Sequence, residues 1–405
     1  MRVFWLAVVE TDCAQADKGR GCMSHKIVIL TEIIAPYRIP VFNALASRPE
    51  VDLHVIFLAE TDPALRKWKI YTDEIRFSYE VLPSLRWRVG KKTLLLNRGV
   101  KRSLHAADGS TMLCGGYNYP ASWQSLWWAR RHGVRFVLWS ESNQQDQRSG
   151  SAITERMKLY FVRHCDAFVV PGKSSFAYLQ KLGVNPQAIY TAPNAVDNDF
   201  FSKQAEAIRR EPSVFREALD LPQRYILYVG RLVPEKGVFD LLEAYAKLGN
   251  QLRSEVGIVF AGNGSSAAEL AQRSKNIRPG TIHFAGFAER EKLASLYALA
   301  DVLVMPTHTD PWGLVVNEAM ACGLPVIVTS VAGCAADLVE DGWNGLVMPP
   351  KDPNKLAAAM SLLLEQFHVR EKMAARSWTR IQSYSPEACA DGLACAAMSI
   401  TPRAR

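Results

Sequence analysis

Short apolar runs alternate with amphipathic segments along the chain from residue 26 onward. In the first half, the apolar runs predict buried strands at Lys26–Leu30, Val51–Leu58, Thr111–Cys114, Val134–Trp139 and Ala167–Val170. Helical patterns lie between them, for example at Ile39–Ala46, Trp123–Arg131 and Thr154–Arg163. Because such strands and helices are typical of parallel sheets covered on both faces, we expect an α/β domain over residues 26–200.

The same alternation restarts after a polar connector at residues 201–222. Strands are predicted at Tyr225–Val229, Val256–Phe260, Ile282–Phe284, Val302–Met305 and Pro325–Thr329. Helices are predicted at Val238–Leu248, Ala267–Arg273, Lys292–Leu299, Leu314–Ala321, Pro353–Glu365 and Val369–Tyr384. The chain therefore predicts a second doubly wound α/β domain over residues 223–385. Ligands of such sheets bind beyond the carboxyl ends of the strands, so we expect the site between the two domains.

Residues 1–25 are predicted to lie outside this fold. They begin like a signal peptide, but the apolar run Val3–Val9 is short and is followed by Glu10 and Asp12. Met23 stands directly before the first predicted strand. We therefore interpret the first residues as an extension of the gene prediction and Met23 as the working start.

The net charge of +8 is distributed unevenly. Residues 1–205 hold 27 Lys and Arg against 18 Asp and Glu, whereas the remainder holds 21 against 22. The excess is greatest over residues 66–102, where cations alternate with bulky groups such as Leu85 and Trp87. Such a segment suits an anionic membrane surface, and the alternative is a solvated face of an acceptor-binding domain. Nucleic acid is not expected, because no helix-turn-helix, zinc-finger or aromatic RNA-binding pattern accompanies the charge.

Cysteine and histidine usage predicts no metal site. The eight cysteines are scattered without a Cys-x-x-Cys pair, and the eight histidines form no ligand-spaced cluster. Asp197-Asn-Asp199 has the D-x-D form of some metal-binding transferases, but it lies in the connector and favours a turn. Reduced thiols in a cytoplasm fit this cysteine pattern.

Two glycine-containing loops follow strands of the second half. Gly230-Arg231 through Lys236-Gly237 offers a guanidinium and an ammonium beside flexible backbone, which suits a diphosphate. Gly262-Asn-Gly264-Ser-Ser-Ala267 satisfies a dinucleotide-binding pattern. A dinucleotide loop normally follows the first strand of its domain, however, and this one follows the second. We expect these glycines to allow close approach to a mononucleotide. The strand end His283–Phe287 is a candidate to stack on or hydrogen-bond its base, and the alternative is that these aromatic side chains belong to the core.

Two acids eight positions apart flank a Trp-Gly-Leu turn. Asp310 is expected on a loop and Glu318 within the first two turns of the following helix. The helix start offers free backbone N–H groups and the positive end of the helix dipole. Phosphate suits that helix end and hydroxyl groups suit the carboxylates, so a nucleotide sugar matches the pair. The alternative is an ordinary helix preceded by a solvated Asp.

Five segments in this order resemble the retaining glycosyltransferases of family 4 (group 1), which have the two-domain GT-B fold. They are GRLVPEKG from Gly230, FAGNGSS from Phe260, HFAGF from His283, MPTHTDPWGLVVNEAMACGLPVI from Met305 and DGWNGLVMPP from Asp341. In the first half, IAPYRIPVFN from Ile34 resembles the opening loop of members that build bacterial surface polysaccharides. The resemblance covers nearly the whole chain from about residue 26.

The resemblance implies a role for each donor-side residue. Arg231 and Lys236 would neutralise the donor diphosphate, and Glu318 would accept hydrogen bonds from the ribose hydroxyls. Asp310 would hold hydroxyls of the transferred sugar. The turn residues Trp312, Gly313 and Leu314 would present backbone N–H groups. Transfer would retain the anomeric configuration, with stabilisation of the departing nucleoside diphosphate as the main contribution and with no divalent metal or other cofactor.

The chain departs from the family at two places. Members usually have Glu at the first acid position, and Asp310 is one methylene shorter, which affects donor preference or rate. Many members also carry a His in the first domain near the reacting centre, where this chain reads Cys114-Gly-Gly-Tyr117-Asn118-Tyr119. Tyr117, Asn118 and Glu141 are the candidates to replace it, and Arg38 of the opening loop is a further acceptor-side candidate. The sequence does not choose among them.

The resemblance thus implies a cytoplasmic enzyme, peripheral at the inner membrane face, in cell-surface polysaccharide biosynthesis. It would move a sugar from a UDP- or GDP-sugar to a glycan or lipid-linked acceptor. Residues 386–405 would return to the first domain, as they do in this fold. Two alternatives stay open: a nucleotide-sugar epimerase of similar fold, and an NAD-dependent oxidoreductase using the Gly262 loop.

Overall fold

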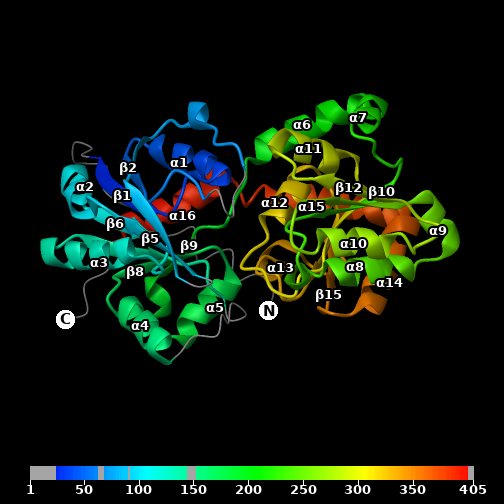
Figure 1. The fold of residues 1–405 in the computed structure, drawn as a ribbon. Helices are drawn as coiled ribbons and strands as arrows, with labels where there is room; N and C mark the ends of the chain where they lie inside the picture. The colour runs from blue at the N-terminus through cyan, green and yellow to red at the C-terminus, as the bar shows by residue number, and fades with distance from the viewer. Residues whose placement is uncertain (1–23, 63–67, 90–91, 144–151, 400–405) are drawn as a thin grey trace.

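The computed structural model describes residues 24–62, 68–89, 92–143 and 152–399, which form two α/β domains side by side (Figure 1). The proposed start at Met23 and the residues before it lie outside this description. The first domain is built on a seven-stranded parallel sheet in the order β3-β2-β1-β6-β7-β8-β9. Its strands are β1 (His25–Thr31), β2 (Val51–Phe57), β3 (Ser78–Val81), β6 (Thr111–Cys114), β7 (Arg135–Trp139), β8 (Ala167–Val170) and β9 (Ile189–Thr191).

Both faces of this sheet are covered, because successive side chains of each strand point to opposite faces. Ile27 and Ile29 of β1 enter one core, and Val28 and Leu30 enter the other. The first core includes α1, and the second includes residues of α2 to α5. The helices are α1 (Ile39–Ala46), α2 (Val100–Ala107), α3 (Pro120–His132), α4 (Ala152–Arg163) and α5 (Lys173–Lys181).

An antiparallel hairpin of β4 (Ser84–Val89) and β5 (Lys92–Asn97) interrupts the first domain, and the sequence pattern did not predict it. Leu85 and Trp87 are 65% and 62% exposed, whereas Arg86 between them pairs with Asp62 at 2.9 Å. Leu85 and Trp87 of β4 therefore face outward. This is the reverse of the burial that such an alternation normally indicates.

The second domain is built on a six-stranded parallel sheet in the order β12-β11-β10-β13-β14-β15. Its strands are β10 (Tyr225–Val229), β11 (Gly257–Ala261), β12 (Ile282–Gly286), β13 (Val302–Met305), β14 (Val326–Thr329) and β15 (Gly345–Met348). The strand order reverses between β10 and β13. In doubly wound sheets this reversal marks the crevice where ligands bind, so the loops after β10 and β13 are the natural place for a site.

Helices cover both faces of the second sheet as well. Tyr228 and Phe260 pack into a core with α8, α10 and α14, while Leu227 and Val259 pack on the other side with α11 and α12. The helices are α8 (Val238–Ala246), α9 (Asn250–Glu255), α10 (Ala267–Ser274), α11 (Arg290–Leu299), α12 (Leu314–Ala321), α13 (Ala335–Leu338), α14 (Pro353–Glu365) and α15 (Phe367–Ile381). The two doubly wound α/β domains predicted from the sequence are therefore confirmed.

The connector is largely helical, although the sequence pattern indicated only a polar segment there. It contains α6 (Asn198–Arg210) and α7 (Pro212–Ala218). The Asp197 side chain accepts a hydrogen bond from the Phe200 N–H at 2.9 Å, which caps the start of α6. Phe201, Ala205 and Ile208 then follow at helical spacing and are buried against the second domain.

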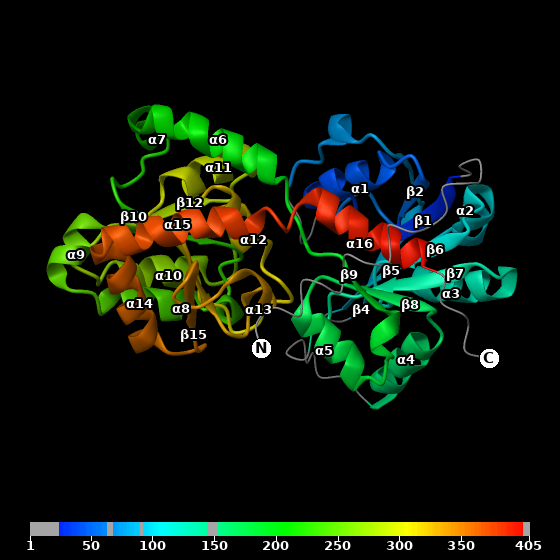
Figure 2. The same cartoon turned by 180° about the vertical axis from the view of Figure 1, so that it is seen from behind.

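The end of the chain spans both domains (Figure 2). Helix α15 packs on the second domain, and the chain then crosses to α16 (Pro386–Met398). Cys389 and Leu393 of α16 are buried in the core that also contains α1 of the first domain. None of the described helices is long and apolar enough to cross a membrane.

Candidate active site

Two loops of the second domain meet at the point where its strand order reverses. Lys236 ends the loop after β10, and Asp310 lies in the loop after β13. The Lys236 Nζ pairs with Asp310 Oδ2 at 2.5 Å and also donates to the Thr309 carbonyl at 3.1 Å. Both side chains are more than four-fifths buried. The structure thus brings together a predicted diphosphate ligand and a predicted sugar ligand, and joins them to each other.

Gly237 allows these two loops to approach. Its φ of +69° lies in the left-handed region, and a Cβ built there would lie 1.9 Å from the Pro306 carbonyl oxygen. Arg231 sits at the other end of the loop, with its side chain 62% exposed and 3.5 Å from Glu235. Its backbone is held by the Tyr228 hydroxyl, which donates to the Arg231 carbonyl at 2.8 Å. The loop backbone is therefore fixed while the guanidinium stays open to solvent.

The glycines of the next loop have a packing role. A Cβ at Gly262 would lie 1.9 Å from the Gly230 carbonyl oxygen, and one at Gly264 would lie 2.2 Å from the Leu232 carbonyl oxygen. The Leu232 N–H also donates to the Asn263 carbonyl at 2.9 Å. The close backbone approach that these glycines allow is therefore to the loop after β10, within the protein itself.

Substituting Gly262 by alanine is expected to destabilise the fold by about 1–3 kcal/mol, the usual cost of overpacking. The φ of +147° at Gly262 adds strain for a residue with a side chain. The midpoint of urea denaturation measures the effect. Gly249→Ala is the matched control, because a Cβ there meets nothing within 4 Å. Equal midpoints for the two variants would contradict this account of Gly262.

Glu318 occupies α12 four residues after its start, as predicted, and its carboxylate has a buried partner. The Tyr297 hydroxyl of α11 donates to Glu318 Oε2 at 2.6 Å. Burial raises the pKa of Glu318 to about 7, and the hydrogen bond from Tyr297 acts in the opposite direction. Sequence reasoning missed Tyr297. The predicted helix contained it, but the register between two helices decides which side chain it meets.

The turn between the two acids is anchored by its own side chains. The Trp312 indole is buried, and its Nε1 donates to Asn317 Oδ1 at 2.9 Å. Asn317 in turn donates to the Asn194 carbonyl at 2.8 Å. The Trp312 backbone N–H donates to Asp310 Oδ1 at 3.1 Å, so the carboxylate itself occupies this predicted ligand contact. Gly313 begins α12 with a φ of +100°, and Leu314 follows as the first helical residue.

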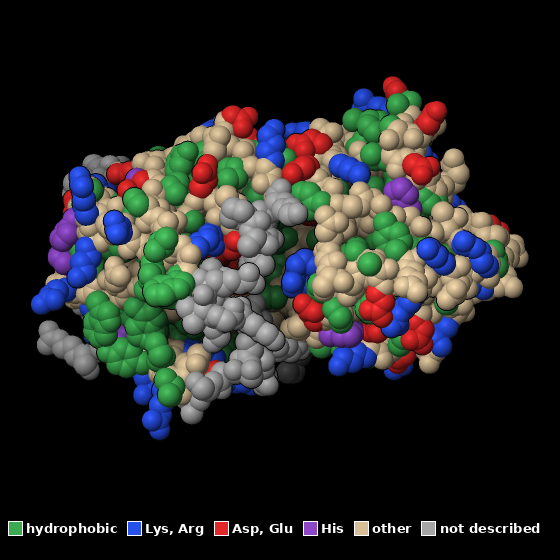
Figure 3. All heavy atoms as spheres, viewed as in Figure 1, with side chains coloured by type: hydrophobic (Ala, Val, Ile, Leu, Met, Phe, Trp, Pro, Cys, Tyr) green, Lys and Arg blue, Asp and Glu red, His purple; other side chains and the backbone are tan. Residues whose placement is uncertain are grey.

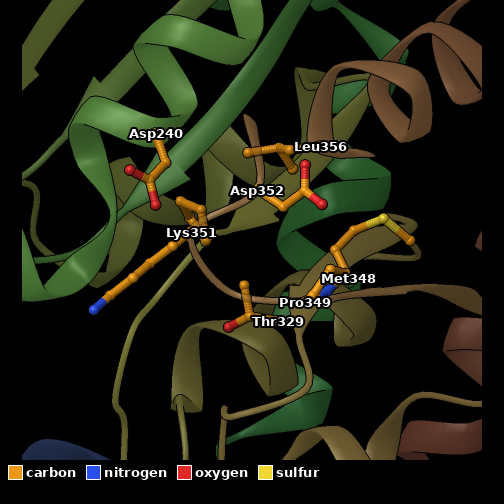
Figure 4. A pocket seen from close by; sticks show the side chains of 8 residues that line it. Asp240, Thr329, Met348, Pro349, Lys351, Asp352 and Leu356 are labelled. Atoms are coloured by element: carbon orange, nitrogen blue, oxygen red, sulfur yellow. The ribbon is translucent and has the colours of Figure 1, made fainter. Parts of the chain in front are cut away.

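Phe287 lies just after β12, 43% exposed, beside Gly286 with a φ of +68°. The Gly286 carbonyl accepts a hydrogen bond from the Gly262 N–H at 2.7 Å, which ties this strand end to the same group of loops. The aromatic ring is therefore free to pack against a ligand. A small cavity of about 10 Å³ lies elsewhere in this domain and is lined by Asp240, Pro306 and Thr329, among others (Figure 4). It holds a water molecule at most, so a nucleotide does not fit there.

On the first domain, the structure brings two of the four acceptor-side candidates together. Arg38 follows β1 and forms an ion pair with Glu141, which follows β7. The Arg38 guanidinium also stacks over the Trp139 ring at 3.9 Å from its centroid. Tyr117 packs partly into the core, 5.8 Å from the Phe161 ring centroid, and burial raises the pKa of its hydroxyl. Asn118 is exposed.

Three sets of contacts join the two domains. The Asn143 side-chain amide donates to the Asp310 and Pro311 carbonyls at 3.4 and 3.3 Å. Arg290 of α11 forms two hydrogen bonds with Glu74, at 2.6 and 3.0 Å. The Lys173 N–H at the start of α5 donates to the Asp337 carboxylate at 3.1 Å. The first domain therefore contacts the Asp310 loop directly, and local sequence patterns carry no signal for such long-range pairs.

Comparison with known proteins shows which family part of this chain matches. Residues 209–378 match the family described as glycosyl transferases group 1. The D-inositol 3-phosphate glycosyltransferase of Kineococcus radiotolerans is 31% identical over 225 residues, which is 52% of this chain and 51% of that protein. The O-antigen chain mannosyltransferase B of Escherichia coli is 31% identical over 169 residues, 41% of this chain and 44% of that protein. These matches therefore span about half of each relative's length.

The fold is shared over nearly the whole chain. The crystal structure of Anabaena Alr3699/HepE in complex with UDP and glucose superposes with a TM-score of 0.71 at 19% identity, covering 91% of this chain and 98% of that chain. At such an identity the likeness concerns the fold alone. Residues 209–378 therefore belong with the glycosyl transferases group 1, and the chain as a whole has the GT-B fold of two facing Rossmann-like domains.

Proposed function

We propose that the protein moves a sugar from a UDP- or GDP-sugar to a glycan or lipid-linked acceptor in cell-surface polysaccharide biosynthesis, with retention at the anomeric carbon. The observation that carries the proposal is the Lys236–Asp310 ion pair beyond the carboxyl ends of β10 and β13, with Glu318 on the helix that follows the Asp310 loop. A cation for phosphate and two carboxylates for hydroxyl groups are the ligands that a nucleotide sugar requires.

The Lys236–Asp310 ion pair gives donor binding an order of events. In the free protein, Lys236 neutralises Asp310 inside a nearly buried contact. A donor diphosphate offers Lys236 a stronger, multiply charged partner. Once the ammonium turns to the phosphate, the Asp310 carboxylate is released to accept hydrogen bonds from sugar hydroxyls. Phosphate binding and sugar binding are then coupled through one displaced ion pair.

Departure of the nucleoside diphosphate develops negative charge, which Lys236 and the exposed guanidinium of Arg231 are suited to stabilise. Glu318 holds the ribose, and Tyr297 fixes the carboxylate that does so. The backbone N–H groups at the start of α12 add the positive end of a helix dipole. This chemistry uses the side chains of the chain and requires no metal ligand set.

The acceptor would bind on the first domain, where Arg38 and Glu141 meet at the carboxyl ends of β1 and β7. The carboxylate accepts hydrogen bonds from sugar hydroxyls, and the Trp139 ring beneath the guanidinium keeps Arg38 in place. Tyr117 and Asn118 follow β6 in the same sheet. Of these candidates, Arg38 and Glu141 are charged partners of each other.

We also propose a cytoplasmic location at the inner face of a membrane, with residues 66–102 as one contact. Leu85 and Trp87 of the hairpin face outward and support it. Arg76 and Arg98 are exposed as well, whereas Arg86 is engaged with Asp62 and contributes less to an anionic surface.

The test is a thermal-shift comparison with UDP, GDP and NAD, followed by nucleoside diphosphate release from UDP- and GDP-sugars. Stabilisation by one nucleoside diphosphate, and release of that diphosphate from its sugar conjugates, is the expected result. Stabilisation by NAD alone would overturn the proposal in favour of an oxidoreductase. Interconversion of two nucleotide sugars without release would favour an epimerase.

A further inference from the structure

Helices α3 and α4 present a group of aromatic side chains to solvent. Trp127 of α3 is 46% exposed and Tyr160 of α4 is 42% exposed, with their ring centroids 5.9 Å apart. Trp123 stacks on Tyr160 at 6.2 Å, and His164 lies 4.1 Å from the same ring. Figure 3 shows hydrophobic side chains gathered over this part of the first domain. The rings bridge the two helices into one surface.

The exposed face of α4 continues this surface. Ile153 and Met157 are 71% and 50% exposed, and with Tyr160 they follow the spacing of one helical stripe. The core of the domain is filled from the opposite side of α4 by Phe161 and Val162, which are buried. The stripe is therefore not needed for packing, although leaving three large apolar side chains in water is unfavourable.

Cations surround this apolar stripe. Arg130 and Arg131 follow Trp127 by one helical turn on α3, and Arg156 and Arg163 lie beside the stripe on α4, all of them exposed. Glu155 is the one acidic residue of the two helices, and it is matched by Lys158 at 2.9 Å. We call the surface of Trp127, Ile153, Met157 and Tyr160 with these four arginines the α3–α4 face.

We propose that the α3–α4 face lies on an anionic lipid bilayer. Trp and Tyr prefer the boundary between headgroups and acyl chains, and Ile153 and Met157 reach the depth where apolar side chains are stabilised. Arginines at the edge of such a surface attract anionic headgroups. The edge carries charge of one sign, since its one carboxylate, Glu155, is already paired with Lys158, and this favours the anionic headgroups of a bilayer. The proposal rests on the membrane location proposed above and names a second contact surface, which involves no residue of the donor site.

The experiment is flotation of the full chain with vesicles of phosphatidylcholine alone or with about a third phosphatidylglycerol. Wild-type protein should float with the anionic vesicles and much less with the neutral ones, and added salt should reduce binding. Ile153→Ser with Met157→Ser should lower the bound fraction about tenfold, because two inserted apolar side chains are lost. Arg156→Gln with Arg163→Gln should weaken binding to anionic vesicles only.

A matched control keeps the result specific. Val214 of the connector helix α7 and Leu362 of the second domain are exposed apolar residues, at 55% and 41%. Val214→Ser with Leu362→Ser should bind vesicles like wild type, and equal melting temperatures would show that all variants are folded. Equal recovery with neutral and anionic vesicles, or unchanged binding of the Ile153–Met157 variant, would overturn the proposal. A solution dimer that this variant abolishes would assign the face to a second copy instead.

Discussion

Lys236→Ala is expected to lower kcat for sugar transfer by about 10²–10³-fold, the usual cost of removing one preorganised charge-stabilising group. The ammonium is held in place before the donor arrives, by Asp310 and by the Thr309 carbonyl. The Lys236 side chain is 16% exposed, so in Lys236→Ala water poorly takes over the charge stabilisation that the ammonium provides. Release of nucleoside diphosphate from the donor sugar, measured at saturating donor, checks the effect.

A second variant separates chemistry from folding. Lys236→Ala leaves the nearly buried Asp310 carboxylate without its cation, which lowers stability. Lys236→Ala combined with Asp310→Asn removes that unpaired charge, so the double variant should regain thermal stability and remain inactive. Lys247→Ala serves as the control, because Lys247 forms an exposed pair with Glu243 on the helix that follows the loop. Full turnover in the double variant would show that Lys236 has no part in the reaction.

Donor affinity is expected to rise with pH through about 7 and to level off above it, because Glu318 must be ionised to accept both ribose hydroxyls. Burial raises the pKa of this carboxyl to about 7 in the free protein. The charged and titratable groups around it are the Tyr297 hydroxyl of α11, the Cys322 thiol of α12 and, beyond that thiol, Arg209 of α6. Calorimetric titration of the nucleoside diphosphate from pH 5.5 to 8.5 measures the curve.

Two substitutions test the assignment. Glu318→Gln should weaken nucleoside diphosphate binding by about 1.5–3 kcal/mol at pH 8, the value of hydrogen bonds to a charged group, and should flatten the pH dependence. Tyr297→Phe removes a hydrogen bond that lowers the pKa of Glu318, so it should move the midpoint to higher pH while Glu318 remains in place. An unchanged midpoint of the affinity curve in Tyr297→Phe would show that the Tyr297 hydroxyl does not affect the pKa of Glu318.

Ionisation of Glu318 changes the stability of the fold in the direction opposite to its effect on donor affinity. Its pKa is raised from an ordinary 4.5 in the unfolded chain to about 7 in the fold, so the folded state binds the proton more tightly. The stability that this group contributes is fully present below pH 4.5 and is lost as pH rises to 7. Relative to wild type, Glu318→Gln should therefore become more stable as pH increases over this range. Burying the ionised Glu318 carboxylate therefore lowers the stability of the fold, and the same ionised carboxylate is the form that binds the donor.

The sequence alone determined most of the regular structure. The strands Thr111–Cys114 and Val302–Met305 and the helix Ile39–Ala46 were predicted with the boundaries that the structure has. Their apolar patterns are local, and the pleat of a strand or the turn of a helix converts them directly into buried faces. The five ordered motifs also indicated the family, because their residues and spacing are properties of the chain itself.

Segments whose packing partner is distant were predicted less well. The helix α6 appeared as a polar connector, because its buried stripe of Phe201, Ala205 and Ile208 has meaning only against the second domain. The hairpin appeared as a basic segment, and its strands were missed because Leu85 and Trp87 face solvent while Arg86 turns inward to Asp62. In both places the tertiary environment overrides the local pattern.

The sequence by itself determined which residues offer chemistry to the site: a cation, two carboxylates and a helix start after the strands of a second α/β domain. Only the tertiary structure decided their partners. The reversal of strand order sets the loops after β10 and β13 side by side, which joins Lys236 to Asp310, and the packing of α11 on α12 sets Tyr297 against Glu318. Spacing along the chain fixes contacts within a helix or loop, but contacts between elements depend on sheet order and helix register, which no local pattern encodes.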